Sequence, residues 1–143
     1  EAYRTTGLPS LADDTGLEVD LLNGAPGVYS ARYAGENVTY NDNVNKILSK
    51  LMIHKDENIR TAKFRTVISY VSGEMELTES GEVEGYITTS EYGSGGFGYD
   101  SIFMPKGFNL TYAEMSQFQK AKISHRSIAL NKMKMKLKKI YKS

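Results

Sequence analysis

One continuous run of β-branched and aromatic residues restricts what this chain can fold into more than any other feature. It covers residues 62–72 and contains Phe64, Thr66, Val67, Ile68, Tyr70 and Val71. Such residues favour the extended, pleated conformation of a β-strand. Gly73 ends the run, and residues 75–77 and 83–89 also have the composition of strands. We therefore expect a central strand with further antiparallel strands beside it.

Two other segments repeat apolar residues with the period of an α-helix. Thr39 and Asp42 form a loose capping box, which predicts a helix over residues 40–52 with apolar positions at Val44, Ile47, Leu48 and Leu51. A second helix is expected after Ser124 as N-cap, with one apolar stripe at Leu130, Met133, Leu137 and Ile140. Strands and helices mixed in one chain without a linker indicate a single α/β domain over residues 1–143 with a mixed sheet.

Composition and charge narrow the class of protein. The chain has no cysteine, which rules out disulfides and thiolate metal sites and favours a reduced, cytoplasmic compartment. No apolar run approaches the length that crosses a bilayer. The net charge of +1 provides no overall attraction to a polyanion. The lysines between Lys132 and Lys142 could bind nucleic acid, but we interpret them as the solvated face of the last helix, because apolar residues interleave them.

A pair of carboxylates forms the first candidate site. An extended segment at residues 8–12 leads into residues 13–16, Asp-Asp-Thr-Gly, whose composition favours a turn, and residues 17–20 alternate like a half-buried strand. Asp13 and Asp14 at such a corner suit Mg²⁺, which takes one or two protein carboxylates and completes its shell with water and phosphate. The alternative is an Asx-turn, in which the aspartates bond only their own backbone. The pair by itself leaves both interpretations open.

A glycine-rich loop at residues 93–98 forms the second candidate. Its sequence fits G-x-G-x-x-G, but the dinucleotide fingerprint needs a helix after the loop, and residues 99–104 have the composition of a strand. A Walker A loop is excluded because no Lys-Ser/Thr pair follows the last glycine. Phe97 and Tyr99 could stack on a flat base, or they could point into the core of a tight turn.

The third candidate is the basic segment that contains Lys120, His125 and Arg126. If Ser124 caps a helix, His125 and Arg126 place cationic donors beside free backbone N–H groups, which is a good anion site. A Lys or Arg can also donate to the 6-keto oxygen of a purine, which adenine lacks. The alternative is a solvated, basic helix start.

In this order along the chain, these motifs resemble one family. Five stretches carry the resemblance: LPSLADDTGLEVD at 8–20, NGAPGVYSARYAGE at 23–36, GGFGYDSIF at 95–103, TYAEM at 111–115 and the segment 120–130 with its Ser-His-Arg. They are similar to the inosine/xanthosine triphosphate pyrophosphatases, Mg²⁺-dependent hydrolases of non-standard purine nucleoside triphosphates. The similarity spans nearly the whole chain. It implies an elongated, two-lobed α/β domain around a long twisted mixed sheet flanked by helices, with the site in a cleft between the lobes.

The resemblance also implies roles for the candidate residues. Asp14 would be the metal-linked general base, Asp13 would support it, and Thr15 would contact the substrate. The base and its neighbouring phosphate would be bound by Phe97, Gly98, Tyr99, Asp100, Lys120, His125 and Arg126, with Phe97 stacking on the base. Water would attack the α-phosphorus of ITP, dITP or XTP and release pyrophosphate, with Mg²⁺ as cofactor. Members of the family are usually homodimers.

The chain departs from the family pattern in three places. The family normally begins with a strand, a Thr-Gly-Asn…Lys loop that grips the triphosphate and a metal-binding Glu, and we expect this segment to be missing here. The alternative function is therefore a catalytically impaired nucleotide-binding module. Ser101 stands where the family favours Pro, and Ser127-Ile128 replaces the usual Gly-Lys.

Overall fold

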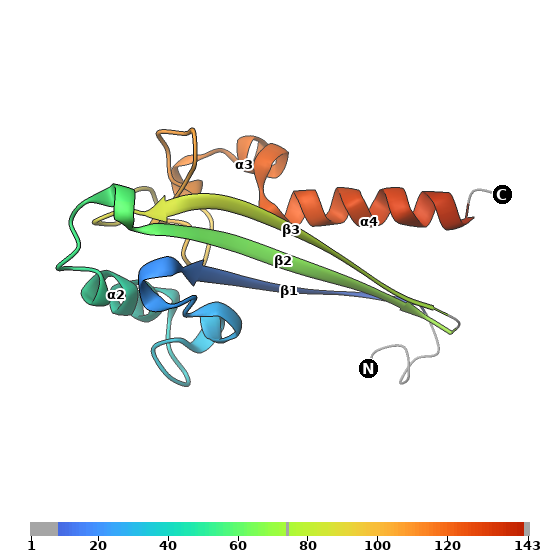
Figure 1. Ribbon diagram of the computed structural model, residues 1–143, viewed down its shortest axis with the longest axis horizontal. Coiled ribbons are helices and arrows are strands. Elements are labelled where there is room, and N and C mark those ends of the chain that lie inside the picture. Colours follow the sequence, from blue (N-terminus) through green and yellow to red (C-terminus); the bar gives the residue numbers. More distant parts are fainter. Residues whose placement is uncertain (1–8, 74, 142–143) are drawn as a thin grey trace.

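Three long antiparallel strands form the body of the molecule. The computed structural model describes residues 9–73 and 75–141. Strands β1 (Ser10–Val19), β2 (Thr61–Ser72) and β3 (Met75–Ile87) lie in that order, and the short β4 (Phe103–Pro105) pairs with β3. The three long strands β1, β2 and β3 run along the length of an elongated molecule (Figure 1). The α/β class is confirmed, but the expected mixed sheet is not, because every pairing between the described strands is antiparallel. A tight turn that joins neighbouring strands, as between β2 and β3, permits only antiparallel pairing.

The turn expected at residues 13–16 is wrong, because these residues lie inside β1. Pairing with β2 continues through them, with Asp13 opposite Ile68. The ladder to the strongly β-forming strand β2 therefore outweighs the local turn preference of the sequence. Gly16 allows the backbone at Gly27 to lie close to β1 and does not form a turn. A Cβ at this position would lie 2.6 Å from the carbonyl oxygen of Gly27.

The two short strands expected at 75–77 and 83–89 are parts of one strand, β3. Its ladder to β2 continues through the polar residues between them. Gly81 lies midway along β3 and allows a helix to rest directly on the sheet, because a Cβ there would overlap the carbonyl oxygen of His125. This contact positions the residues at the start of the last helix.

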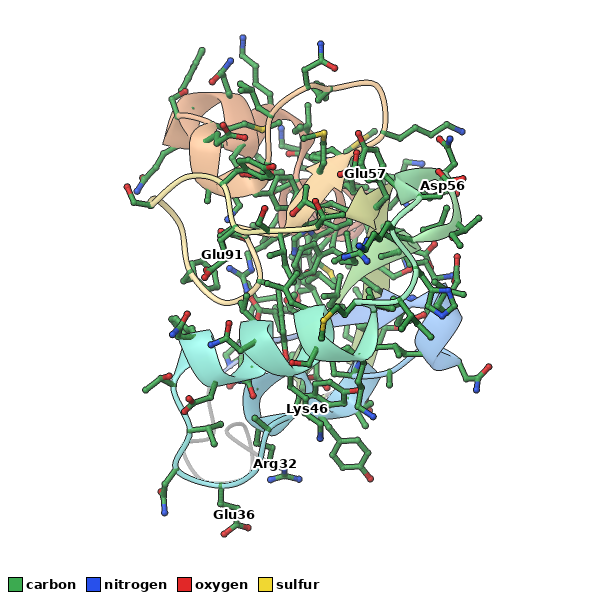
Figure 2. All side chains as sticks on the ribbon, turned by 90° about the vertical axis from the view of Figure 1, so that its left-hand side faces the viewer. Arg32, Glu36, Lys46, Asp56, Glu57 and Glu91 are labelled. Carbon is green, nitrogen blue, oxygen red and sulfur yellow. The ribbon has the colours of Figure 1, made fainter. Side chains whose placement is uncertain are left out.

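Helix α2 (Tyr40–Lys50) covers one end of the sheet and confirms the first predicted helix. Both halves of its capping box form, with Asp42 N donating to Thr39 Oγ1 at 3.1 Å and Thr39 N donating to Asp42 Oδ2 at 2.9 Å. Its buried face joins the main core, which includes Leu17, Val19, Val44, Ile47, Leu51, Phe64 and Phe103. The 3₁₀ helix η2 (Gly27–Arg32) lies beside it, and Figure 2 views this end with Arg32 and Glu36 on the outside.

Helices α3 (Gln117–Ile123) and α4 (His125–Tyr141) form the other covering group. Ser124 is the N-cap of α4 as predicted, since Ser127 N donates to Ser124 Oγ at 3.1 Å. The apolar stripe predicted for this helix is only partly right, because Met133 is buried but Leu130 and Ile140 are exposed. α4 lies on β2 and β3, and the face that meets Ile68 also contains Ala129.

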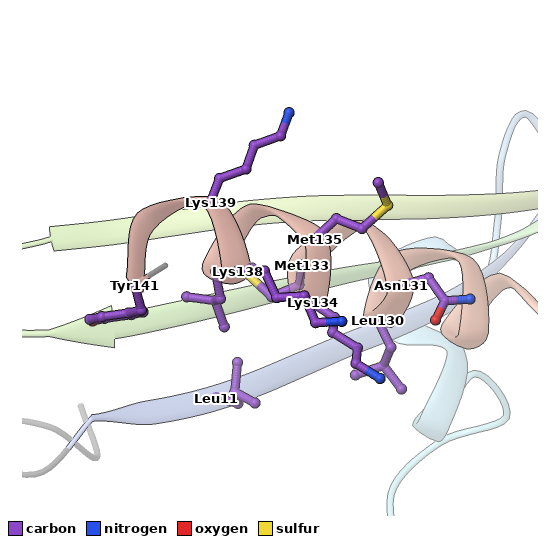
Figure 3. A pocket seen from close by; sticks show the side chains of 10 residues that line it. Leu11, Leu130, Asn131, Met133, Lys134, Met135, Lys138, Lys139 and Tyr141 are labelled. Carbon is purple, nitrogen blue, oxygen red and sulfur yellow. The ribbon is translucent and has the colours of Figure 1, made fainter. Parts of the chain in front are cut away.

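The exposed side of α4 borders an apolar groove above β1. The groove has a volume of about 1020 Å³ and is lined by Leu11, Leu130, Met133, Met135, Leu137 and Tyr141 with three lysines (Figure 3). It is lined by no carboxylate and no histidine among the described residues. None of the helices in the described part of the chain combines the length and apolarity that a bilayer crossing needs.

Candidate functional site

A second pocket, of about 510 Å³, contains most of the residues predicted from the sequence. One wall comes from η2 and α2, and the other comes from the glycine loop, α3 and the start of α4. Its volume is typical of small-molecule sites. The polar and aromatic residues that line it include Thr15, Ser30, Tyr40, Asn43, Phe97, Tyr99, Asp100, Lys120, His125 and Arg126.

The glycine loop turns one aromatic ring toward the pocket and buries the other. Phe97 is 51% exposed and lines the pocket. Tyr99 is buried, and its hydroxyl donates to the carbonyl oxygen of Ser30 at 2.6 Å. Burial raises the pKa of Tyr99 well above its usual range, so this hydroxyl remains a donor. The core alternative is therefore confirmed for Tyr99, whereas Phe97 keeps an exposed face and its stacking on a base stays a prediction.

Asp100 closes the loop on itself and holds a lysine. Its buried carboxylate accepts from Phe97 N at 3.0 Å and from Lys120 Nζ at 2.5 Å. The loop continues past Asp100, so the strand expected at residues 99–104 is mostly wrong. Residues 99–102 form turns, and only the last part, β4, is extended. Lys120 Nζ also lies 4.8 Å from the centroid of the Phe97 ring, which keeps a cation beside the exposed aromatic ring.

His125 is a buried, stacked histidine and not the cation that its sequence position indicated. Its ring stacks on Phe64 with centroids 4.6 Å apart, and its Nδ1 lies 3.4 Å from the hydroxyl of Tyr112. Burial, with the positive charges of Arg126 and Lys120, lowers the pKa of His125 to about 4. At neutral pH His125 is therefore an uncharged hydrogen-bonding group at the pocket wall.

This pKa predicts that acid destabilises the fold through His125. The folded pKa lies below the unfolded value of about 6.5, so the unfolded chain binds more protons between these values, and stability falls as the pH falls through this window. We expect urea unfolding to show a loss of about 2 kcal/mol between pH 7 and pH 5 from this group. His125→Phe should remove most of that loss. His54→Gln changes the only other histidine of the sequence and should retain the loss. If the unfolding free energy of both variants fell equally between pH 7 and pH 5, the loss could not be assigned to His125.

Arg126 ties the start of α4 to β1. Its Nε lies 3.2 Å from Asp13 Oδ2, and its Nη2 donates to Thr15 Oγ1 at 3.3 Å. The guanidinium carbon is 5.9 Å from the centroid of the Phe97 ring. Residues from β1, the glycine loop and α4 therefore meet around one pocket, although they are remote in the sequence.

Neither Asp13 nor Asp14 lines this pocket: Asp13 is linked to it only through Arg126, and Asp14 is not linked to it at all. Side chains alternate along a strand, so Asp14, between Asp13 and Thr15, faces away from Arg126. Its exposed carboxylate makes no hydrogen bond or ion pair within the described part of the chain. Residues 9–73 and 75–141 hold no cluster of three or more acidic, histidine or cysteine side chains that could bind a metal. β1 is, however, the edge strand of the described sheet, so no other described strand pairs with it on the side away from β2, and Asp14 lies at this edge.

Sequence reasoning missed the wall that α2 and η2 contribute. Tyr40 lines the pocket, and the buried Asn43 accepts from Ala34 N at 2.8 Å and donates to the carbonyl oxygen of Ala31 at 3.1 Å. The capping box located α2 along the chain, but no local signal indicates which face of a helix meets a distant loop.

The protein is thus an α/β domain with one pocket suited to a flat, anionic ligand. The pocket offers the exposed ring of Phe97 with Lys120 and Arg126 beside it, and two carboxylates lie at the nearby sheet edge. The chain belongs to the Ham1 family, whose model matches residues 1–136. It is 46% identical over 132 residues to the dITP/XTP pyrophosphatase of Porphyromonas gingivalis, which covers 92% of this chain and 67% of that protein. It is 51% identical over 128 residues to the dITP/XTP pyrophosphatase of Leuconostoc mesenteroides, with 89% and 63% covered.

A solved relative has the same fold. The Ham1 protein of Staphylococcus aureus superposes with a TM-score of 0.88 at 43% identity, over 94% of this chain and 69% of that chain. The chain thus spans about two thirds of the length of the relatives it matches.

Proposed function

We propose that this protein hydrolyses the non-standard purine nucleoside triphosphates ITP, dITP and XTP to the monophosphate and pyrophosphate. This reaction would remove non-standard triphosphates from the cellular nucleotide pool. Relatives with the name dITP/XTP pyrophosphatase share about half of their aligned residues with it. The observation that carries the proposal is the convergence of Phe97, Lys120 and Arg126 on one pocket. A cytoplasmic location and a homodimer belong to the same proposal, the first because the chain has no cysteine and the second by resemblance to the family.

The base end of the substrate would lie at the glycine loop. Phe97 offers an exposed face for stacking, and such stacking tolerates any flat base. Discrimination would come from Lys120 and Arg126, because both can donate to a 6-keto oxygen and neither can accept from the 6-amino group of adenine. An adenine in the same place would turn the N–H groups of its 6-amino group toward these N–H donors, so that no hydrogen bond could form between them, which is costly in a pocket.

The phosphate end would cross the free edge of β1 near Asp14. Asp14 has an exposed carboxylate that pairs with no other described residue, and Asp13 precedes it in the chain. This pair fits Mg²⁺, which uses few protein ligands. Asp14 would hold this ion, which when bound would neutralise charge on the phosphates. Asp13 is already paired with Arg126 and would support the site from the other face of the strand.

In the proposed reaction, a water oxygen bonds to the α-phosphorus while the bond from that phosphorus to the bridging oxygen breaks. Asp14 would accept the proton of the water, and pyrophosphate would leave. Reactions of this kind depend mainly on positioning and on charge neutralisation, so the protein needs no covalent intermediate.

A pyrophosphate-release assay with ITP, XTP, GTP and ATP tests the proposal. We expect ITP and XTP to be preferred to ATP by about 100-fold or more in kcat/KM, because a site that donates hydrogen bonds to a keto oxygen strongly rejects an analogue that lacks this oxygen. EDTA should abolish turnover, and added Mg²⁺ should restore it. Equal rates with ITP, XTP and ATP would refute the substrate assignment.

The alternative is a nucleotide-binding module without turnover. It is favoured by two observations on the described residues: Asp14 lies outside the pocket, and no group of three or more acidic, histidine or cysteine side chains that could hold a metal ion is found among them. Calorimetry decides between the two functions: Mg²⁺-dependent binding of ITP without release of pyrophosphate would support the binding module.

A further inference from the structure

Tyr40 lies across the mouth of the pocket from Phe97. It is the first residue of α2, and its ring centroid is 6.4 Å from that of Phe97, with the two planes inclined at 44°. The two side chains are 59% and 51% exposed. Both line the 510 Å³ pocket and a smaller neighbouring one of about 220 Å³. Two large, half-exposed aromatic rings thus face the same opening.

The backbone under Tyr40 is firmly held. The capping box of Thr39 and Asp42 fixes the first turn of α2. One turn further on, the buried amide of Asn43 bonds Ala31 and Ala34, which fastens α2 to the segment around η2. The exposed Tyr40 therefore belongs to an ordered helix start, so its backbone is held in a defined position while its ring remains partly exposed.

The separation of the two rings matches what a bound base requires. Atoms in contact lie about 3.5 Å apart, so two rings on opposite sides of a flat base are separated by about 7 Å. The present 6.4 Å needs only a small widening, and a partly exposed side chain can rotate to bring the planes closer to parallel. Lys120 and Arg126 lie 4.8 and 5.9 Å from the Phe97 ring centroid, within reach of the edge of a base stacked there.

We propose that Tyr40 is a second base-contacting residue, which closes on the purine from the side opposite Phe97. The identity of the ligand as a purine nucleotide rests on the proposed function. The contact uses the face of the ring, so it is independent of the hydroxyl. It would add affinity for the base in both substrate and product without taking part in the chemical step.

Three variants test this contact: Tyr40→Ala, Tyr40→Phe and, as a matched control, Tyr29→Ala. Tyr29 is 58% exposed on η2 and lies outside the pocket. Calorimetry with IMP measures binding without turnover, and the pyrophosphate assay with ITP gives KM and kcat. We expect Tyr40→Ala to raise the Kd of IMP and the KM of ITP by about tenfold with kcat within about twofold, because loss of one stacking contact has this size. Tyr40→Phe and Tyr29→Ala should behave like the unmodified protein.

The outcomes separate this inference from the proposed function. If Tyr40→Ala binds IMP as tightly as the Tyr29→Ala control, Tyr40 does not contact the base. If Tyr40→Phe is weakened as much as Tyr40→Ala, the hydroxyl and not the ring face carries the contact, and the inference is wrong. If the unmodified protein binds IMP but does not hydrolyse ITP, the IMP series still decides the role of Tyr40 while the hydrolase proposal falls. If it binds no purine nucleotide at all, both proposals fall.

Discussion

Replacement of Asp14 by Asn is expected to lower kcat for ITP by about 1000-fold without unfolding the protein. Loss of a general base typically costs between about 100- and 10,000-fold, and the same change would weaken the binding of Mg²⁺. The fold should survive because the Asp14 side chain is exposed and bonds no other described residue. Circular dichroism and thermal unfolding would verify the fold, and the pyrophosphate-release assay at saturating ITP and Mg²⁺ would measure the loss.

Two further carboxylate variants make this prediction sharper. Asp13→Asn should act mainly through Arg126, whose ion pair it weakens, and so should change KM more than kcat. Glu36→Gln is the matched control, since Glu36 is exposed and points outward at the lower edge of the view in Figure 2. If Asp13→Asn abolished turnover while Asp14→Asn retained it, the base would be the carboxylate that pairs with Arg126, and the assignment of Asp14 would be wrong.

Replacement of Arg60 by Met is expected to lower the free energy of unfolding by about 4 kcal/mol. Arg60 is a fully buried arginine, and its guanidinium donates at 2.6 to 2.8 Å to the carbonyl oxygens of Leu51, His54, Ile87 and Thr88. It joins the chain after α2 to the chain after β3, which leads into the glycine loop. Burial lowers the pKa of Arg60, while Glu57 partly opposes this shift. Methionine would fill the space but leave these carbonyls without donors, and each such loss costs about 1 to 3 kcal/mol.

Urea unfolding measures this loss, and two other variants show that it comes from the hydrogen bonds. Arg60→Lys keeps the charge but cannot reach four carbonyls from one ammonium, so we expect an intermediate loss. Arg32→Met removes an arginine at the outer surface (Figure 2) and should change stability by less than about 0.5 kcal/mol. A loss for Arg60→Met no larger than for Arg32→Met would contradict the role of the buried guanidinium.

Helix starts and the central strand were predicted because their signals are local. The capping box of Thr39 and Asp42 and the N-cap at Ser124 are satisfied within one turn of chain, so a single sequence contains the information. The β-branched run at 62–72 likewise formed β2 almost without change. Elements whose conformation depends on a partner were predicted less well. Asp-Asp-Thr-Gly looked like a turn and became part of β1, because β2 supplies hydrogen bonds that a turn cannot match.

The candidate site was predicted as a set of residues and not as an arrangement. The motif positions Phe97, Asp100, Lys120 and Arg126 converge as the resemblance implied. His125 was expected to be a cation, but stacking on Phe64 removes it from water and lowers its pKa. Phe64 lies 61 residues earlier in the chain, so no local window of sequence relates the two residues.

By itself, the sequence determined which residue types are present, where helices start, where the strongest strand runs and which family the motifs resemble. Only the tertiary structure decided that Asp13 pairs with Arg126 while Asp14 faces the other way, that Asp100 holds Lys120, and that Tyr40 stands opposite Phe97. The physical reason is that capping and propensity act over a few neighbouring residues, whereas burial, strand register and ion pairing depend on groups that meet only when the whole chain has folded.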